Sequence, residues 1–180
     1  VIGLSVVAGL RSTAQGGLRL FLPVYMVDVG GLPLAYAGLA LMALSVGGSI
    51  TAIPAGIASD RYGRRPVVMV ALGISTVLIA GFTLIENEFA MVGGVCLIGF
   101  SIYALRPVMI SWILDITPDE LGGSATNLLS TVQSLFNSVM PFVAGLIATK
   151  YGLVSVFYLF AVLLMAANVV AYFLPKDHGK

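Results

Sequence analysis

Three polar residues interrupt the first apolar stretch of the chain at regular intervals. Arg11, Gln15 and Arg19 are four residues apart, so a helix would carry them along one face. Guanidinium and amide groups donate hydrogen bonds to carboxylates, phosphates and other polar groups. We expect this face to line a water-filled cavity and to contact an anionic or polar solute. The alternative is structural, with an arginine that extends to a polar surface or pairs with a carboxylate.

A further arginine stands deep within a later apolar stretch. Arg106 lies about 17 residues into it, three residues after Tyr103 and directly before Pro107. If the stretch crosses a membrane, this guanidinium cannot easily reach either surface, and ionisable residues at such depth are usually functional. We expect Arg106 and Tyr103 to face the bundle interior or the same cavity. No carboxylate lies at comparable depth.

Small polar residues mark the fifth apolar stretch. They recur near helical spacing, as Asn127, Ser130, Thr131, Ser134, Asn137 and Ser138. We expect them to pack helices together, because small and polar side chains allow close contact and hydrogen bonds between membrane helices. The pairs Gly47–Gly48 and Gly93–Gly94 have the same interpretation.

The residue inventory argues against an enzyme. The chain has one cysteine, Cys96, and one histidine, His178, so it lacks the residues for an internal disulfide, a metal cluster or a nucleophile–base pair. We expect no catalytic residue, no metal and no cofactor. The net charge of +1 gives no electrostatic reason to bind nucleic acid.

The elements that must position these residues are apolar segments. Of the 180 residues, 59% are hydrophobic and 9% are charged, whereas a soluble domain has about 25% charged residues. A helix needs about 20 apolar residues to cross a bilayer, and short polar breaks divide the chain into six such stretches. We predict an all-α membrane protein, a single bundle with transmembrane helices over 1–27, 34–59, 66–85, 89–116, 121–149 and 152–174 and a cytoplasmic tail over 175–180.

The basic residues predict the orientation. Six spans place both ends of the chain on one side, which holds Arg61, Arg64, Arg65, Lys176 and Lys180, while the other side holds Lys150. Because cytoplasmic loops carry the excess of Lys and Arg, we expect both ends in the cytoplasm, in a bacterial inner membrane. The chain opens on Val1 without the features of a signal peptide, which suggests a part of a longer protein.

Two helix ends repeat one pattern half a chain apart. Segments 56–63 and 145–152 share a glycine, an aliphatic residue, a basic residue, a tyrosine and a final glycine at an offset of 89 residues. Pro54 and Pro141 precede them. Three helices separate the copies, so the copies leave the membrane on opposite faces, as in the inverted three-plus-three repeats of some transporters. The alternative is chance, since Gly and Tyr are common at helix ends.

The turn between the second and third helices is densely charged. It follows the pattern G-x-x-x-D-R-x-G-R-R, with Gly56, Asp60, Arg61, Gly63, Arg64 and Arg65 at the defined positions. The glycines permit a close helix approach and a tight turn, and the acid suits a helix N-terminus. The pattern resembles the signature loop of the major facilitator superfamily. Arginines that only set topology are the alternative, but they leave the acid and the glycines unexplained.

Two other segments are similar to the same family. Segment 115–121 resembles its acidic turn between the fourth and fifth helices of a half. Segment 141–145 resembles a degenerate form of a proline motif found in the fifth helix of family exporters, where Met140 stands in place of a glycine.

The resemblance implies a secondary transporter for a small solute. In that family two six-helix bundles rock about a central site. This chain would supply one bundle and one wall of the cavity, and its partners would be the lipid bilayer and a second bundle, either the other half of the same protein or a copy. The short tail resembles the end of a carboxy-terminal half. An amino-terminal half remains the alternative, as does a complete six-span channel or scaffold.

The resemblance also implies a contact that controls gating. In the family, the arginine that Arg64 resembles meets the acid that Asp115 resembles. We therefore expect Arg64 or Arg61 to lie within salt-bridge reach of Asp115. We expect Asp60 to act separately, by capping a helix of the other half.

Overall fold

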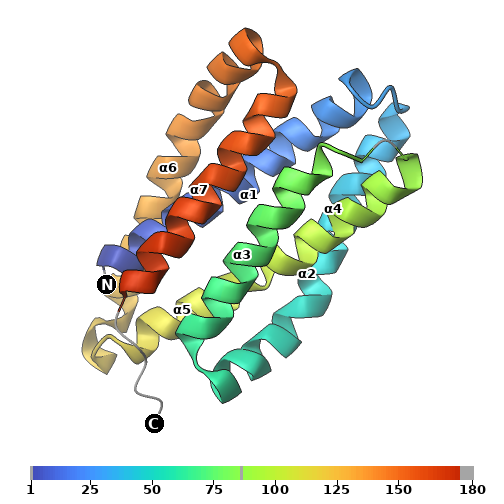
Figure 1. Cartoon of the computed structure of the whole chain (residues 1–180). Coiled ribbons are helices and arrows are strands. Elements are labelled where there is room, and N and C mark those ends of the chain that lie inside the picture. Colours follow the sequence, from blue (N-terminus) through green and yellow to red (C-terminus); the bar gives the residue numbers. More distant parts are fainter. Residues whose placement is uncertain (1, 86, 175–180) are drawn as a thin grey trace.

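The computed structural model describes residues 2–85 and 87–174, and nearly all of them lie in helices (Figure 1). The predicted tail, 175–180, with Lys176, His178 and Lys180, lies outside these ranges, as does Val1. In chain order the helices are α1 Ile2–Asp28, α2 Leu34–Tyr62, α3 Arg64–Phe82, α4 Glu88–Tyr103, α5 Leu105–Asp115, the 3-10 helix η1 Asp119–Leu121, α6 Gly122–Tyr151 and α7 Leu153–Phe173.

Helices α4 and α5 are two parts of the fourth predicted span. The helix expected over 89–116 is interrupted at Ala104, three residues before Pro107. The proline has no N–H for the carbonyl of Tyr103, and its ring crowds that carbonyl, which explains a break at this point. Each of the other predicted spans is one helix, so the six-helix architecture is confirmed.

Five of the six spans are long and apolar enough to cross a membrane by themselves. They are α2, α3, the α4–α5 pair taken as one span, α6 and α7. Helix α1 has 27 residues, which suffices in length, but its two arginines and Gln15 lower its hydropathy. The helix that is least apolar is therefore the one that carries most of the predicted cavity residues.

Two hairpin turns consist of a single glycine each. Gly63 separates α2 from α3 with φ 92° and ψ 151°, and Gly152 separates α6 from α7 with φ 84° and ψ 165°. This backbone region is essentially restricted to glycine. Because one residue makes the turn, α2 extends three residues beyond its predicted end at 59 and α3 begins two residues before its predicted start at 66.

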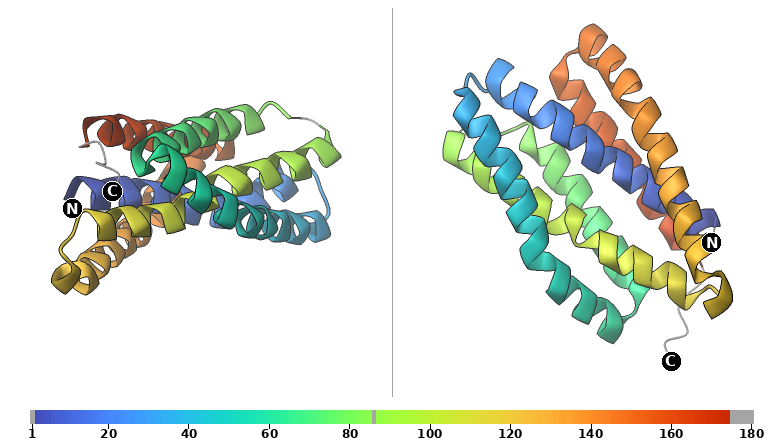
Figure 2. Two further views of the ribbon diagram at one scale, coloured as in Figure 1. Left: turned by 90° about the horizontal axis from the view of Figure 1, so that it is seen from below. Right: turned by 180° about the vertical axis from the view of Figure 1, so that it is seen from behind.

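The packing pattern agrees with an internal repeat. Helix α2 packs most extensively on α4, α1 packs on α6 and α7, and α3 packs on α7 and α4. Exchanging the first three spans with the last three reproduces these pairs. The turn after α2 and the turn after α6 lie at opposite ends of the bundle (Figure 1). Seen from behind, α1 runs between α2 and α6, and α3 and α7 lie on the other face (Figure 2).

Aromatic rings pack α1, α3 and α7 together, and glycine lets α2 and α4 approach closely. Tyr25, Phe82 and Phe157 join α1, α3 and α7, with ring centroids 4.7 to 5.7 Å apart. Where α2 crosses α4, a Cβ added to Gly47 would lie 2.6 Å from the carbonyl oxygen of Cys96. The expected packing role of Gly47 is thus confirmed, whereas a Cβ at Gly93 would meet no atom within 4 Å.

Candidate functional site

A polar cavity lies between α1, α5 and α6. Its volume is about 220 Å³. Its lining consists of Arg11, Ser12, Gln15, Gly16 and Arg19 from α1, Arg106 from α5, and Gln133 and Asn137 from α6. The structure thus brings together four residues that the sequence assigned to a cavity, Arg11, Gln15, Arg19 and Arg106, from two distant segments. Contact between these residues and a solute stays a prediction.

The cavity lies about halfway along α1 and α6. Gln15 is the central residue of α1, with thirteen helical residues on each side. At about 1.5 Å per residue, this places Gln15 about 20 Å from either end. Gln133 and Asn137 lie on either side of the midpoint of α6. The polar groups therefore gather near the level where transporters bind their substrates.

Arg11 is the deepest of the cavity residues. Only 2% of its surface is exposed, and its Nη1 donates a hydrogen bond to the carbonyl oxygen of Ile102 at 3.2 Å. That carbonyl lies just before the interruption at Ala104, so Arg11 bonds to the backbone where the fourth span breaks. Its Nε has no partner among the described residues. An arginine at the centre of a membrane helix costs about 2.5–3.5 kcal/mol on insertion scales, which argues for a role that offsets this cost.

Tyr103 positions Arg19 rather than lining the cavity itself. The Nε of Arg19 donates to the hydroxyl of Tyr103 at 2.5 Å, and the guanidinium carbon lies 5.1 Å from the centre of the tyrosine ring. A cation over an aromatic face is attracted to its quadrupole. Tyr103 was expected to face the bundle interior or the cavity, and it is not among the residues that line the cavity.

Arg106 enters the cavity because the fourth span breaks two residues before it. Its side chain is exposed in this bundle. It lies near Arg11, and the two positive charges repel each other. The alternative that a cavity arginine pairs with a structural carboxylate does not hold among the described residues, since the ion pairs there belong to Arg64.

Helix α6 contributes two residues that sequence reasoning placed elsewhere or missed. Asn137, expected to pack helices, lines the cavity and also donates from Nδ2 to Ser12 Oγ at 2.8 Å. Gln133 lies one turn earlier on the same face, and this spacing of four residues was the signal that could have found it. The other members of the polar stripe, Asn127, Ser130, Thr131, Ser134 and Ser138, are exposed in this bundle.

A second polar cluster lies at the end of the bundle where α2 meets α3. The Nε of Arg64 lies 3.0 Å from Oδ2 of Asp115, which confirms the expected contact between the third and fourth spans. Arg64 also pairs with Asp60 and donates to Ser59 Oγ at 2.6 Å. The turn at Gly63 thus brings Asp60, at the end of α2, to Arg64, at the start of α3. The expected role of Asp60 as a cap for a helix of the other half stays a prediction. Asp60 does not cap α3, which has no side-chain cap.

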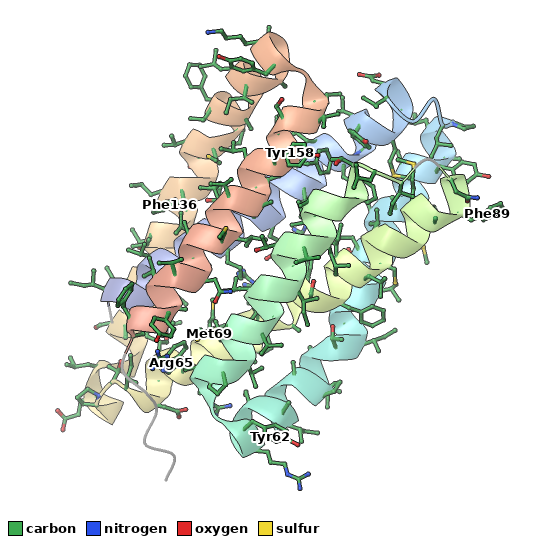
Figure 3. All side chains as sticks on the ribbon, viewed as in Figure 1. Tyr62, Arg65, Met69, Phe89, Phe136 and Tyr158 are labelled. Carbon is green, nitrogen blue, oxygen red and sulfur yellow. The ribbon has the colours of Figure 1, made fainter. Side chains whose placement is uncertain are left out.

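The remaining residues of the signature loop differ in their surroundings. Arg61 and Tyr62 are exposed at the tip of α2, and Arg65 lies beside the end of α7, where it donates to the Tyr172 carbonyl (Figure 3). Gly63 makes the turn, as expected. A Cβ at Gly56 would meet no atom within 4 Å, so the close approach expected at Gly56 is not made by the described residues.

The chain is similar to a known protein family and to curated proteins over most of its length. The family model described as Major Facilitator Superfamily matches residues 4–180. The multi-drug resistance efflux pump PmrA of Streptococcus pneumoniae is 29% identical over 161 residues, which cover 87% of this chain and 40% of the pump. The chain thus spans about 40% of the length of this curated relative.

Solved structures share the fold at low sequence identity. The POT family transporter PepTSo superposes with a TM-score of 0.84 at 15% identity, over 99% of this chain and 38% of that transporter. The xylose transporter XylE from E. coli, in an inward open conformation, superposes with a TM-score of 0.72 at 16% identity, over 97% of this chain and 47% of XylE.

Proposed function

This chain belongs to the Major Facilitator Superfamily, and on that premise we propose that it is one half of a secondary transporter that moves a small solute by alternating access. The observation that carries the proposal is the polar cavity at the midpoint of α1 and α6. In such carriers the solute site lies near the bilayer midplane between two bundles, which rock about it.

The exposed polar face of α6 supports a second bundle. In its most apolar stretch, only 6% of the residues are buried, and Asn127, Ser130, Thr131, Ser134 and Ser138 are exposed. Polar side chains in membrane helices avoid lipid and face protein or water. We propose that this face meets the other half of the same protein or a second copy, as expected for a chain that spans about 40% of its relative.

The contacts of Arg64 support a gate at one end of the bundle. They join the turn after α2 to the end of α5, the helix that also carries Arg106. A movement of α5 at the cavity would therefore alter the contact between Arg64 and Asp115. We propose that this contact stabilises one of the two states of the carrier. We also propose that Asp60 leaves Arg64 and caps a helix of the other half when the gate closes.

The distribution of charges supports an orientation. Arg61, Arg64 and Arg65 lie at the end where α1 begins and α7 ends, and Lys150 lies at the opposite end (Figure 1). By the positive-inside rule we propose that both ends of the chain lie in the cytoplasm, in a bacterial inner membrane.

Alternating access can be tested without knowing the solute. The test uses the full-length carrier in oriented vesicles, with Cys96 replaced by serine and a single cysteine introduced as Gln15→Cys. A membrane-impermeant maleimide should label this cysteine from either side of the membrane. Locking the carrier with a cross-link at one end should abolish labelling from that end and preserve it from the other.

The control is a cysteine of equal depth on the opposite face. Val162 lies near the middle of α7 and is 63% exposed in this bundle, so Val162→Cys should face lipid and stay unlabelled. Equal protection of Gln15→Cys and Val162→Cys would refute the cavity. Labelling of Gln15→Cys from both sides despite the cross-link would indicate a channel instead of a carrier.

A further inference from the structure

The charge of the cavity is one-sided. Its lining contains three guanidinium groups, three primary amides and one hydroxyl, and it contains no carboxylate. The lining residues lie near the midpoints of their spans, far from either membrane surface. Three positive charges held together in such a place favour a negative charge between them.

The hydrogen bonds of Arg11 and Arg19 do not neutralise their positive charges. Arg19 is bonded to the hydroxyl of Tyr103 and Arg11 to the carbonyl of Ile102, and both of these acceptors are neutral. Arg11 and Arg106 repel each other. Arg11 and Arg19 are therefore held in position, and none of the three arginines forms an ion pair with a residue that the structure describes.

Arg11 also keeps a donor free. Its side chain is almost fully buried, yet its Nε has no acceptor among the described residues. Buried donors in proteins are nearly always bonded. A free donor on a buried guanidinium that lines a cavity is suited to a ligand that brings its own acceptor.

We propose that the cavity binds a small organic anion through a carboxylate or phosphate group, held by Arg106 and by the guanidinium of Arg11. The proposal rests on the proposed function, because it takes the cavity as the solute site. Arginine suits this task because its planar donors match both kinds of oxyanion. Gln15, Gln133 and Asn137 are placed to bond the polar remainder of the solute, and Arg19, fixed by Tyr103, adds to the positive potential.

The test compares three probes of nearly equal shape and different charge: 4-methylbenzoate, 4-methylbenzamide and 4-methylbenzylamine. Their affinity for the full-length carrier in nanodiscs of neutral lipid is measured by calorimetry. We expect the benzoate to bind at least about tenfold more tightly than the amide or the amine, which corresponds to about 1.4 kcal/mol. Equal affinities, tighter binding of the amine, or binding of none of the three overturns the proposal.

Single-residue variants test whether the preference for the benzoate arises in the cavity. Arg106→Gln, at an exposed position that should not disturb folding, should remove the preference for the benzoate, and Arg106→Lys should retain part of it because it keeps the charge but loses the planar donors. Lys150→Gln removes an equal charge outside the cavity and should leave the preference intact. A preference that survives Arg106→Gln overturns the assignment of the site.

The anion site and the proposed function are tested by separate measurements, so one can be refuted without the other. A carrier that binds the benzoate but shows no alternating labelling of Gln15→Cys refutes the proposed function and leaves the anion site standing. A carrier that alternates but prefers the amine refutes the anion site and leaves the proposed function standing.

Discussion

The turn after α2 and the turn after α6 have the same backbone but different chemistry. In both, a tyrosine ends one helix, a glycine with positive φ makes the turn, and the next helix begins at once. Tyr62 and Tyr151 are 68% and 65% exposed, and the basic residue before each lies over its ring, Arg61 at 5.9 Å and Lys150 at 5.2 Å from the centroid.

The difference begins with the residue after the glycine. Arg64 pairs with Asp60 and Asp115, whereas Leu153 in the matching position is half-buried and apolar. The turn after α6 forms without these ion pairs, so they are not required for the shape of the turn. The repeat thus preserves a backbone, while the charge cluster belongs to one end of the molecule.

The largest effect is expected from removing the charged residue that distinguishes the two turns. Arg64→Ala loses its contacts with Asp60, Asp115 and Ser59, and should lower the free energy of unfolding by about 2–3 kcal/mol, because bonds to charged groups are the stronger ones. In the vesicle assay it should also raise labelling of Gln15→Cys from the Arg64 end by about fivefold or more, as expected for a gate biased by a few kcal/mol.

Two variants calibrate this result. Leu153→Ala alters the matching position and should leave the labelling ratio unchanged. Arg64→Lys keeps the positive charge that sets topology but loses the planar donors, so it should still shift the ratio. Wild-type labelling in Arg64→Lys would mean that Arg64 only sets topology.

The next effect concerns what the two turns share. Gly63→Ala and Gly152→Ala force a Cβ into a backbone region that only glycine adopts readily, and each should cost about 1–3 kcal/mol of stability. Neither added Cβ would meet an atom closer than 3.6 Å, so the cost comes from the backbone alone. Thermal unfolding in detergent should show similar losses for both variants.

A helical glycine provides the control. Gly38 in α2 has no neighbour within 4 Å of an added Cβ, and Gly38→Ala should leave stability unchanged or raise it by about 0.5–1 kcal/mol. Markedly unequal losses at Gly63 and Gly152 would contradict a shared turn geometry.

A smaller effect is expected from the coupling within the charged turn. In a double-mutant cycle, Arg64→Ala and Asp115→Ala should be non-additive by about 0.5–1 kcal/mol. The value is modest because the side chain of Asp115 is 51% exposed, against 17% for Arg64. The cycle with Asp60→Asn should give a smaller coupling, since Asp60 is 66% exposed.

Chemical denaturation of the single and double variants measures both couplings. Asp60→Asn should fold and insert normally while altering the labelling of Gln15→Cys. Zero coupling between Arg64 and Asp115 would mean that this contact does not stabilise the gate.

The smallest effect is expected where the two turns are alike. Arg61→Gln and Lys150→Gln each remove a cation that lies over an exposed ring, a contact worth about 0.5–1 kcal/mol at most. Both variants should change the free energy of unfolding by about 0.5 kcal/mol or less. A clearly larger loss at one site would show that the basic residue has a further partner there.

Several features of this protein followed from the sequence alone. The apolar stretches predicted six helices, because a bilayer requires long apolar segments. The matching segments 56–63 and 145–152 predicted the repeat, and the spacing within 56–65 pointed to the family, because turns depend on residues that are close in the chain. The pair of Arg64 and Asp115 followed from the resemblance and not from spacing.

The arrangement of the cavity was decided only by the tertiary structure. Helical spacing grouped Arg11, Gln15 and Arg19, but it could not show that Arg11 would be buried against the Ile102 carbonyl, 91 residues away. The role of Tyr103 in holding Arg19 and the entry of Gln133 also depend on other helices. The physical reason is that spacing determines which residues share a helix face, whereas packing between distant segments determines what that face meets.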